Sequence, residues 1–199
     1  MTLRLQSPKR AIAFALLLAL GSIPSPAAAA APDLADAAGN YGITPASRIH
    51  FTVAQAGGGG IAGNFARFSG SFRIDRNDVG HSTVEFTLYP ESVKTGEKRI
   101  EDFLKSSAVF DTANYNTVTF RSTNVKQTGP DTAAVEGTLT ARGTSRKERF
   151  SVTLLDWNRA SIAFNIRGNI HRSPYGMDVG TPIYSNVVEF DMNIKGQRR

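Results

Sequence analysis

The chain has 199 residues, of which 20% are charged and 41% hydrophobic, and its formal net charge is +6. It contains no cysteine, which excludes disulfide bonds, thiolate metal sites and a lipid anchor attached through an N-terminal cysteine. Three of the six net positive charges lie in the first 31 residues, which carry no acidic residue, so only +3 remains on the rest. Because this remainder has no basic stripe with stacking aromatics, we expect no nucleic-acid partner.

The first 31 residues have the composition of a cleavable secretory signal peptide. Three basic residues precede an apolar run at positions 11–20, and small residues follow. Ten apolar residues are too few for the roughly 20 that span a bilayer. We therefore expect cleavage after Ala29 or Ala30, export to the periplasm, and no stable membrane anchor afterwards.

Residues 32–40 are expected to form a flexible lead-in, and strand patterning begins after Tyr41. Eight segments alternate apolar and polar residues, as strands with one buried and one solvated face do. They cover residues 48–53, 68–75, 82–90, 116–122, 133–141, 149–155, 161–170 and 186–196. Turn-forming residues separate these segments, and residues 197–199 are expected to form a basic tail.

One stretch departs from the alternation. Ile100, Phe103 and Leu104 fall at helical spacing, which predicts a single short amphipathic helix over residues 97–106. One short helix cannot cover the apolar faces of eight strands, so the sheet must pair with another or close on itself. Short sequential connections favour an all-β fold, an eight-stranded antiparallel barrel built as a meander.

The motifs associated with catalysis or cofactors are weak. Gly58, Gly60 and Gly63 match the spacing of a dinucleotide fingerprint, but a strand pattern follows them where a helix is required. We interpret the glycine run as a hairpin connection. The three histidines, at positions 50, 81 and 171, have no metal-binding spacing. We expect no catalytic residue, no metal and no cofactor.

The inward phase of the strands carries many of the twelve phenylalanines. An eight-stranded barrel is wide enough either to be filled by its own side chains or to hold one small ligand. Gly70, Gly137, Ala141 and Gly168 fall on the same phase and could leave room for a ligand. The pattern leaves both possibilities open.

Five motifs follow one another along the second half of the chain: SVKTG at 92–96, LKSSAVFD at 104–111, YNTVTF at 115–120, GTLTARGTSR at 137–146 and RSPYGM at 172–177. In this order they resemble the motifs of YceI-like proteins, and the resemblance covers residues 41–196. It implies a lipocalin-like barrel with a helix at its opening. It also implies binding of long polyisoprenoid molecules such as quinone tails and prenyl phosphates.

The resemblance makes an apolar isoprenoid-like or quinone-like lipid the expected partner, held in the barrel lumen. The expected lining combines inward strand positions with the inner face of the helix. These residues are Phe51, Val53, Phe72, Val84, Phe86, Leu88, Ile100, Phe103, Leu104, Phe120, Leu139, Phe164, Ile166 and Phe190. Head-group contacts are expected from basic residues near one mouth, namely Arg67, Lys98, Arg99 and Arg172.

The sequence departs from the family pattern at the polar end of this site. Residues 44–47 and Gln55 replace an acid and histidines that are usual there, so the resemblance does not indicate which head group is accepted. Two other functions use the same scaffold and remain open from the sequence. One is a small-molecule enzyme, and the other is a protein that acts through its surface.

Overall fold

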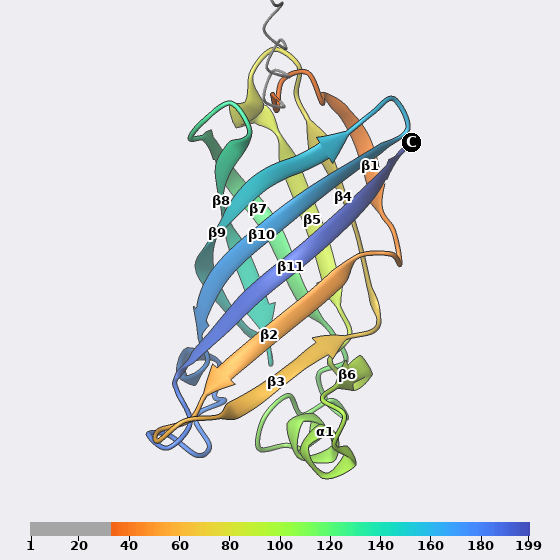
Figure 1. Cartoon of the computed structure of the whole chain (residues 1–199). Coiled ribbons are helices and arrows are strands. Elements are labelled where there is room, and N and C mark those ends of the chain that lie inside the picture. Colours follow the sequence, from red (N-terminus) through yellow and green to blue (C-terminus); the bar gives the residue numbers. More distant parts are fainter. Residues whose placement is uncertain (1–32) are drawn as a thin grey trace, which may run out of the picture. The chain divides into compact units, whose positions relative to one another are not determined.

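Alternating apolar and polar residues form one continuous antiparallel sheet in the computed structural model, which describes residues 33–199 (Figure 1). The signal peptide predicted for residues 1–31 lies outside the described residues. The strand segments are β1 (Gly39–Ile43), β2 (Arg48–Ala54), β3 (Gly60–Phe65), β4 (Phe68–Ile74), β5 (Thr83–Leu88), β6 (Val93–Lys94), β7 (Val118–Gln127), β8 (Thr132–Ala141), β9 (Thr144–Trp157), β10 (Ser161–His171) and β11 (Val187–Arg198).

The sheet closes into a barrel because β1 pairs with strands on both of its sides. Tyr41 lies opposite Phe72 of β4 and opposite Arg198 of β11. The segment β3 pairs with β2 on one side and with β6 on the other, and β1 with β2, β3 with β4, and β5 with β6 are the halves of three strands that each contain one break. The eleven segments therefore make eight strands, and the predicted eight-stranded antiparallel barrel is confirmed.

The break between β1 and β2 is held in the sheet by a serine side chain. The Oγ of Ser47 accepts a hydrogen bond from the backbone N–H of Lys195 at 2.9 Å and donates to its carbonyl at 3.2 Å. The N–H of Thr44 donates to the same carbonyl at 2.8 Å. Ser47 is 9% exposed, so these bonds replace ladder contacts that the break removes.

The segment before β1 was expected to be a flexible lead-in, and the structure corrects this. Leu34 and Ala37 are buried in the core at 3% and 0% exposure. The N–H of Leu34 donates to the carbonyl of Pro130 at 2.9 Å, and the hydroxyl of Tyr41 donates to the carbonyl of Ala37 at 2.7 Å. The lead-in thus forms a packed turn across one end of the barrel.

The structure also corrects the basic tail expected for residues 197–199, because the last strand extends into it. Strand β11 continues to Arg198, whose guanidinium donates to the carbonyl of Ala38 at 2.9 Å and to the Tyr41 hydroxyl at 2.7 Å. A third bond reaches the carbonyl of Arg159 at 2.9 Å. Arg198 therefore ties β11 to β1 and to the β9–β10 turn, where closure of the barrel requires it.

The helix α1 (Lys98–Lys105) confirms the predicted helix to within one residue at each end. Three single-turn 3₁₀ helices accompany it: η1 (Val79–His81), η2 (Pro90–Ser92) and η3 (Ser173–Tyr175). Figure 1 shows α1 at the same end of the barrel as the blue β10–β11 loop. In the described part of the chain, no helix combines the length and the apolar character of a membrane span.

The carboxylate of Glu101 fixes the turn that leads into α1. It accepts hydrogen bonds from the N–H groups of Thr95 at 3.0 Å and Gly96 at 3.4 Å, and it pairs with the Lys94 ammonium at 3.2 Å. The bond from the Thr95 N–H, assisted by Lys94, lowers the pKa of Glu101. The charged form of Glu101 thus anchors the helix at its first turn.

Replacing Ser47 with alanine tests the role of the bridge across the strand break. The Ser47→Ala variant removes two partly buried hydrogen bonds to the backbone of Lys195, and we expect it to lower the free energy of unfolding by roughly 1–2 kcal/mol. Urea denaturation followed by circular dichroism measures the loss. Ser69→Ala, on the exposed outer side of β4, is the matched control, and equal midpoints for the two variants would contradict the assignment.

Candidate ligand-binding cavity

The barrel contains a cavity of about 250 Å³ that runs between its two ends. Inward side chains of the strands form its wall. Leu34 reaches it from one end, and Leu104, Val109 and Phe110 reach it from the other. Among the described residues, its lining includes neither a carboxylate nor a histidine, so the surface it offers is dominated by hydrocarbon.

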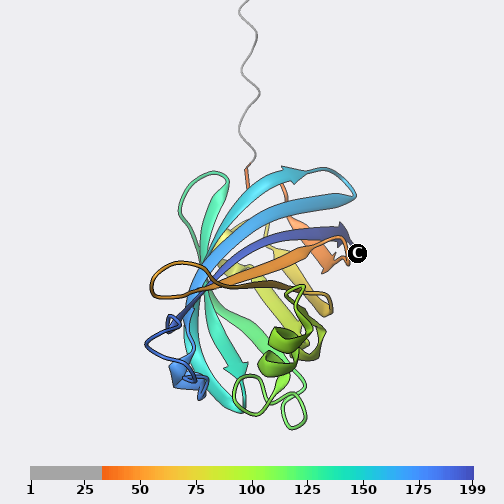
Figure 2. The same cartoon turned by 60° about the horizontal axis from the view of Figure 1, so that its bottom comes forward.

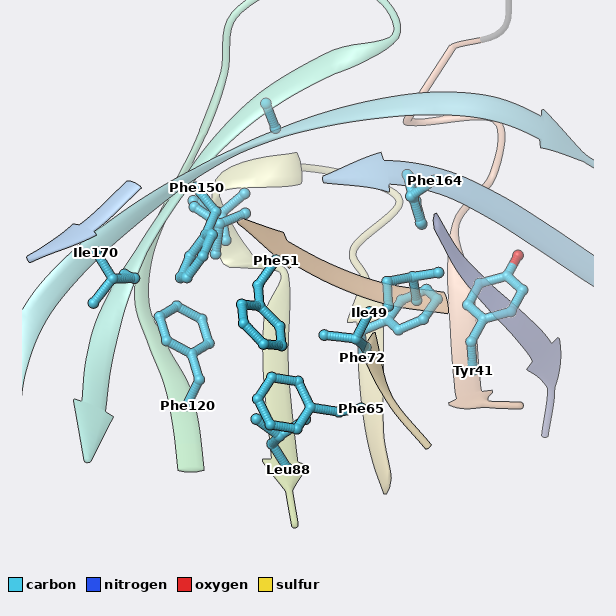
Figure 3. Packing of buried hydrophobic residues seen from close by; sticks show 14 of the residues in the cluster. Tyr41, Ile49, Phe51, Phe65, Phe72, Leu88, Phe120, Phe150, Phe164 and Ile170 are labelled. Atoms are coloured by element: carbon cyan, nitrogen blue, oxygen red, sulfur yellow. The ribbon is translucent and has the colours of Figure 1, made fainter. Parts of the chain in front are cut away.

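The structure brings together twelve of the fourteen residues expected to form the lining. They are Phe51, Val53, Phe72, Val84, Phe86, Leu88, Leu104, Phe120, Leu139, Phe164, Ile166 and Phe190. Figure 3 shows rings from different strands, among them Phe51, Phe65 and Phe120, directed into the same interior. The position of these residues is thereby established, and contact with a ligand remains a prediction.

The helix contributes less to the cavity than expected. Leu104 lines it and Ile100 packs partly buried against the core, but Phe103 is 43% exposed and does not reach it. The inward orientation predicted for Phe103 is therefore wrong. Residues four apart share one face of a helix, and a residue adjacent to Leu104 points about 100° away from it.

The residues that close this end were missed because they lie outside any periodic segment. Val109 and Phe110 follow α1 in a series of turns, and both line the cavity. The ring of Phe110 packs edge-on against Phe65, with the centroids 5.7 Å apart. Periodicity carries no information about such turns. The only sequence signal was the YceI-like motif at residues 104–111, which includes both residues.

Two inward glycines lie directly beneath phenylalanine rings of neighbouring strands. A Cβ on Gly168 would stand 2.4 Å from Cδ1 of Phe150, and one on Gly137 would stand 2.5 Å from Cζ of Phe120. The two rings meet edge to face with centroids 5.2 Å apart (Figure 3). The glycines therefore let large rings lie against the wall, and the volume that remains lies between the rings rather than at the glycines.

Arg172 is the one buried charged side chain among the described residues, at 7% exposure. Its guanidinium donates to the backbone carbonyls of Ser185 at 2.8 Å, Val179 at 2.9 Å and Tyr184 at 3.2 Å, and also to that of Met177. Burial lowers the pKa of Arg172, although a guanidinium stays protonated in proteins. Arg172 thus cross-links the β10–β11 loop from inside.

Tyr175, three residues after Arg172 in the RSPYGM motif, forms a second buried contact beside the cavity. Tyr175 is 2% exposed, and its hydroxyl donates to Oε1 of Glu148 at 2.8 Å. Burial, together with this hydrogen bond to Glu148, raises the pKa of Tyr175, so the hydroxyl remains a donor at ordinary pH. The RSPYGM motif at residues 172–177 therefore determines the conformation of the loop beside the cavity.

The other basic residues expected at the polar end are not brought to the cavity. Lys98 pairs with Asp102 at 2.6 Å on the exposed side of α1, and the guanidinium of Arg67 lies 4.4 Å from the centroid of the Tyr89 ring. Arg99 is exposed. No three histidine, aspartate or glutamate side chains of residues 33–199 converge as metal ligands would.

The ring-over-glycine packing predicts a specific cost for a single added methyl group. In Gly168→Ala the Phe150 ring must move toward the lumen, and we expect a loss of about 1–3 kcal/mol in the free energy of unfolding. Thermal and urea denaturation measure it. In the Phe150→Leu background the smaller side chain leaves room for the methyl group, so the same substitution should cost less, and equal costs in both backgrounds would contradict the contact.

The loop anchor is tested by exchanging one cation for another. Arg172→Lys keeps the charge but cannot reach four carbonyls, and we expect a loss of about 2–4 kcal/mol with faster proteolysis within residues 177–185. Arg167→Lys is the control, because Arg167 makes an exposed ion pair with Asp191 at 3.4 Å, and such pairs contribute under about 1 kcal/mol. Similar cleavage rates in the two variants would show that Arg172 does not hold the loop.

Two solved structures share this barrel fold. The solved structure of Burkholderia cenocepacia BcnA superposes with a TM-score of 0.71 at 23% identity, covering 77% of this chain and 98% of that one. A polyisoprenoid binding domain from Saccharophagus degradans, implicated in plant cell wall breakdown, superposes with a TM-score of 0.66 at 16% identity, covering 81% and 99%. At these identities the likeness establishes the fold alone.

Sequence relatives agree with the fold. A UPF0312 protein of Pseudomonas paraeruginosa is 28% identical over 156 residues, which is 76% of this chain and 81% of the relative. Protein YceI of Escherichia coli O17:K52:H18 is 25% identical over 153 residues, with 74% and 80% covered. The model of the YceI-like domain matches residues 41–196, so the chain belongs to the YceI-like family.

Proposed function

We propose that this protein is a periplasmic carrier that holds the apolar tail of an isoprenoid-like lipid inside its barrel. The observation that supports the proposal most directly is the cavity of about 250 Å³ with its hydrocarbon lining. The periplasmic location rests on the signal peptide expected from residues 1–31. The Saccharophagus degradans protein that shares this fold is a polyisoprenoid binding domain, which supports the ligand class.

The size of the cavity argues for a function rather than for loose packing. At about 24 cal/mol per Å³ of cavity, a space of 250 Å³ lowers folding stability by roughly 6 kcal/mol. Natural domains are stable by only about 5–15 kcal/mol in total. A sequence that could fill the lumen with its own phenylalanines instead packs them against the wall. We infer that the volume is maintained for a ligand.

The volume also limits what can be held. It exceeds the roughly 150 Å³ of an engineered apolar cavity that binds benzene, and it lies near the lower end of common ligand pockets of about 300–1,000 Å³. The cavity therefore suits a few isoprene units of a longer tail. Ten buried methylene groups would contribute about 8 kcal/mol gross, and the entropy of association removes at least about 4 kcal/mol of it.

Apolar contact is not directional, so tails of different length and branching should bind with similar affinity. Head-group selection must come from a polar group at one end of the cavity. Arg172 is nearby, but its hydrogen bonds to four carbonyls leave at most one N–H for a ligand. We infer that the tail contributes most of the affinity.

Lipid carriage predicts that ligand leaves with the protein during purification. Organic extraction of the full chain purified without delipidation, followed by mass spectrometry, should yield an isoprenoid or a similar apolar lipid. A fluorescent quinone analogue should bind the extracted protein and raise its melting temperature, since binding to the native state alone stabilises it. An extract free of lipid together with no uptake of the analogue would rule the proposal out.

A substitution that fills the cavity without burying a charged group separates binding from folding. Val152 lines the cavity from β9, and Val152→Trp should reduce affinity for the quinone analogue at least about tenfold, because a few buried methylene groups no longer fit. Ser151→Trp places the same ring on the exposed side of β9 and should bind normally. Circular dichroism verifies that both variants are folded, and equal affinities would place the ligand outside the barrel.

A further inference from the structure

Two loop segments at the end of the barrel beside the cavity carry no charged side chain, and the exposed Asp178 directly precedes one of them. Residues 54–66 and residues 179–188 contain no Asp, Glu, Lys, Arg or His. The N–H of Ala56 donates to the carbonyl of Ile183, and that of Ser185 donates to the carbonyl of Ala54, both at 2.8 Å. We call residues 54–61 and 179–186 the uncharged rim. Figures 1 and 2 show the tip of the orange β2–β3 hairpin beside the blue loop.

The uncharged rim exposes aliphatic side chains. Ile183 is 59% exposed and Val179 is 38% exposed. The tip of the adjacent β2–β3 hairpin consists of exposed glycines at positions 57–60, which add no polar side chain. By contrast Phe103, although exposed at the same end, lies next to the ion pair of Lys98 and Asp102. The combination of exposed aliphatics and absent charge is thus particular to the rim.

The backbone of the uncharged rim is already hydrogen-bonded within the protein. The guanidinium of Arg172 donates hydrogen bonds to the carbonyls of Val179, Tyr184 and Ser185. The N–H of Ala56 donates to the carbonyl of Ile183. Backbone polar groups without a partner are what makes loops costly to place in a membrane interface. The internal bonds remove part of that cost.

The lining of the cavity extends into the uncharged rim. Val179 lines the cavity and is also partly exposed, and Tyr184, next to the exposed Ile183, lines it as well. A lipid tail that leaves the lumen at this point meets aliphatic side chains and glycine rather than charged groups. The rim therefore continues the apolar surface of the lumen to the outside of the protein.

We propose that the uncharged rim docks on the surface of a lipid bilayer, so that a lipid passes between membrane and cavity without crossing water. This proposal rests on the proposed lipid ligand. Exposed aliphatics on a backbone that is partly hydrogen-bonded within the protein suit insertion at the depth of the lipid headgroups. A protein partner would instead be expected to meet charged or aromatic anchors, which are common at protein interfaces and which the rim lacks apart from Tyr184.

Vesicle flotation with the full chain tests the docking. The protein should float with phosphatidylcholine vesicles and equally with vesicles that also contain phosphatidylglycerol, at high salt as well as low, because the rim carries no charge. Ile183→Glu should reduce the bound fraction at least about tenfold, since it places a charge where an aliphatic side chain would enter the bilayer. Leu155→Glu is the matched control, because Leu155 is 53% exposed on β9, and it should float as the unaltered protein does.

Transfer kinetics separate docking from lipid binding. Ile183→Glu should take up the quinone analogue from dilute ethanol as the unaltered protein does, yet extract it from vesicles at least tenfold more slowly. Failure of the unaltered protein to float, or equal behaviour of Ile183→Glu and Leu155→Glu, would overturn the docking proposal while leaving lipid binding intact. Flotation without uptake from either source would overturn lipid carriage and support the docking surface alone.

Discussion

The packing of aromatic rings over glycines is the contact on which the interior depends. A closed sheet of eight strands directs one face of every strand inward, and such a barrel is small enough for its own residues to fill it. The glycines at positions 137 and 168 have no Cβ, so the rings of Phe120 and Phe150 can lie against the neighbouring strand instead of in the centre of the barrel. Close contact and a hollow lumen are therefore compatible here, because these rings pack against the backbone of the neighbouring strand as well as against each other.

Ring-over-glycine packing also explains why the barrel needs rigid ends. Side chains that line a space lack partners on one side and contribute less to stability than those of a filled core. Strand closure and the two ends must compensate for this. Arg198 joins β11 to β1 at one end, and Arg172 joins the turns of the β10–β11 loop at the other. Both arginines act on backbone carbonyls, which a guanidinium can reach in several directions.

The sequence predicted those parts of the molecule that periodicity controls. Alternation located the eight strands, and Ile100 with Leu104 located α1, because each pattern reflects burial against a single surface. It did not locate β1 or β3, whose glycines and alanines carry little hydrophobic contrast. It also misassigned Leu34 and Arg198, since burial of a turn and of a terminal cation depends on contacts with segments far away in the chain.

The residues of the candidate site also fall into those that periodicity predicted and those that it did not. Wall residues such as Phe51 and Phe164 follow from the strand phase, whereas Val109 and Phe110 at the end do not, because turns have no period. Phe103 shows the limit within an element: three apolar residues on one helix do not all share a face. The role of Arg172 was beyond pattern alone, since a motif with a basic residue suggests a ligand contact as readily as a structural one.

The two ends of the barrel differ in how much must break for a ligand to pass. At the lead-in end, Leu34 and Ala37 are buried and Arg198 makes three hydrogen bonds that also maintain strand closure. Opening there would disrupt the β1–β11 pairing that makes the sheet a barrel. At the other end, the loops between β2 and β3 and between β10 and β11 are joined by two backbone hydrogen bonds, from Ala56 to Ile183 and from Ser185 to Ala54, and breaking these bonds would leave the eight strands paired. Exchange through the loop end therefore requires the smaller disruption, and it is the end where the apolar surface of the lumen continues to the outside.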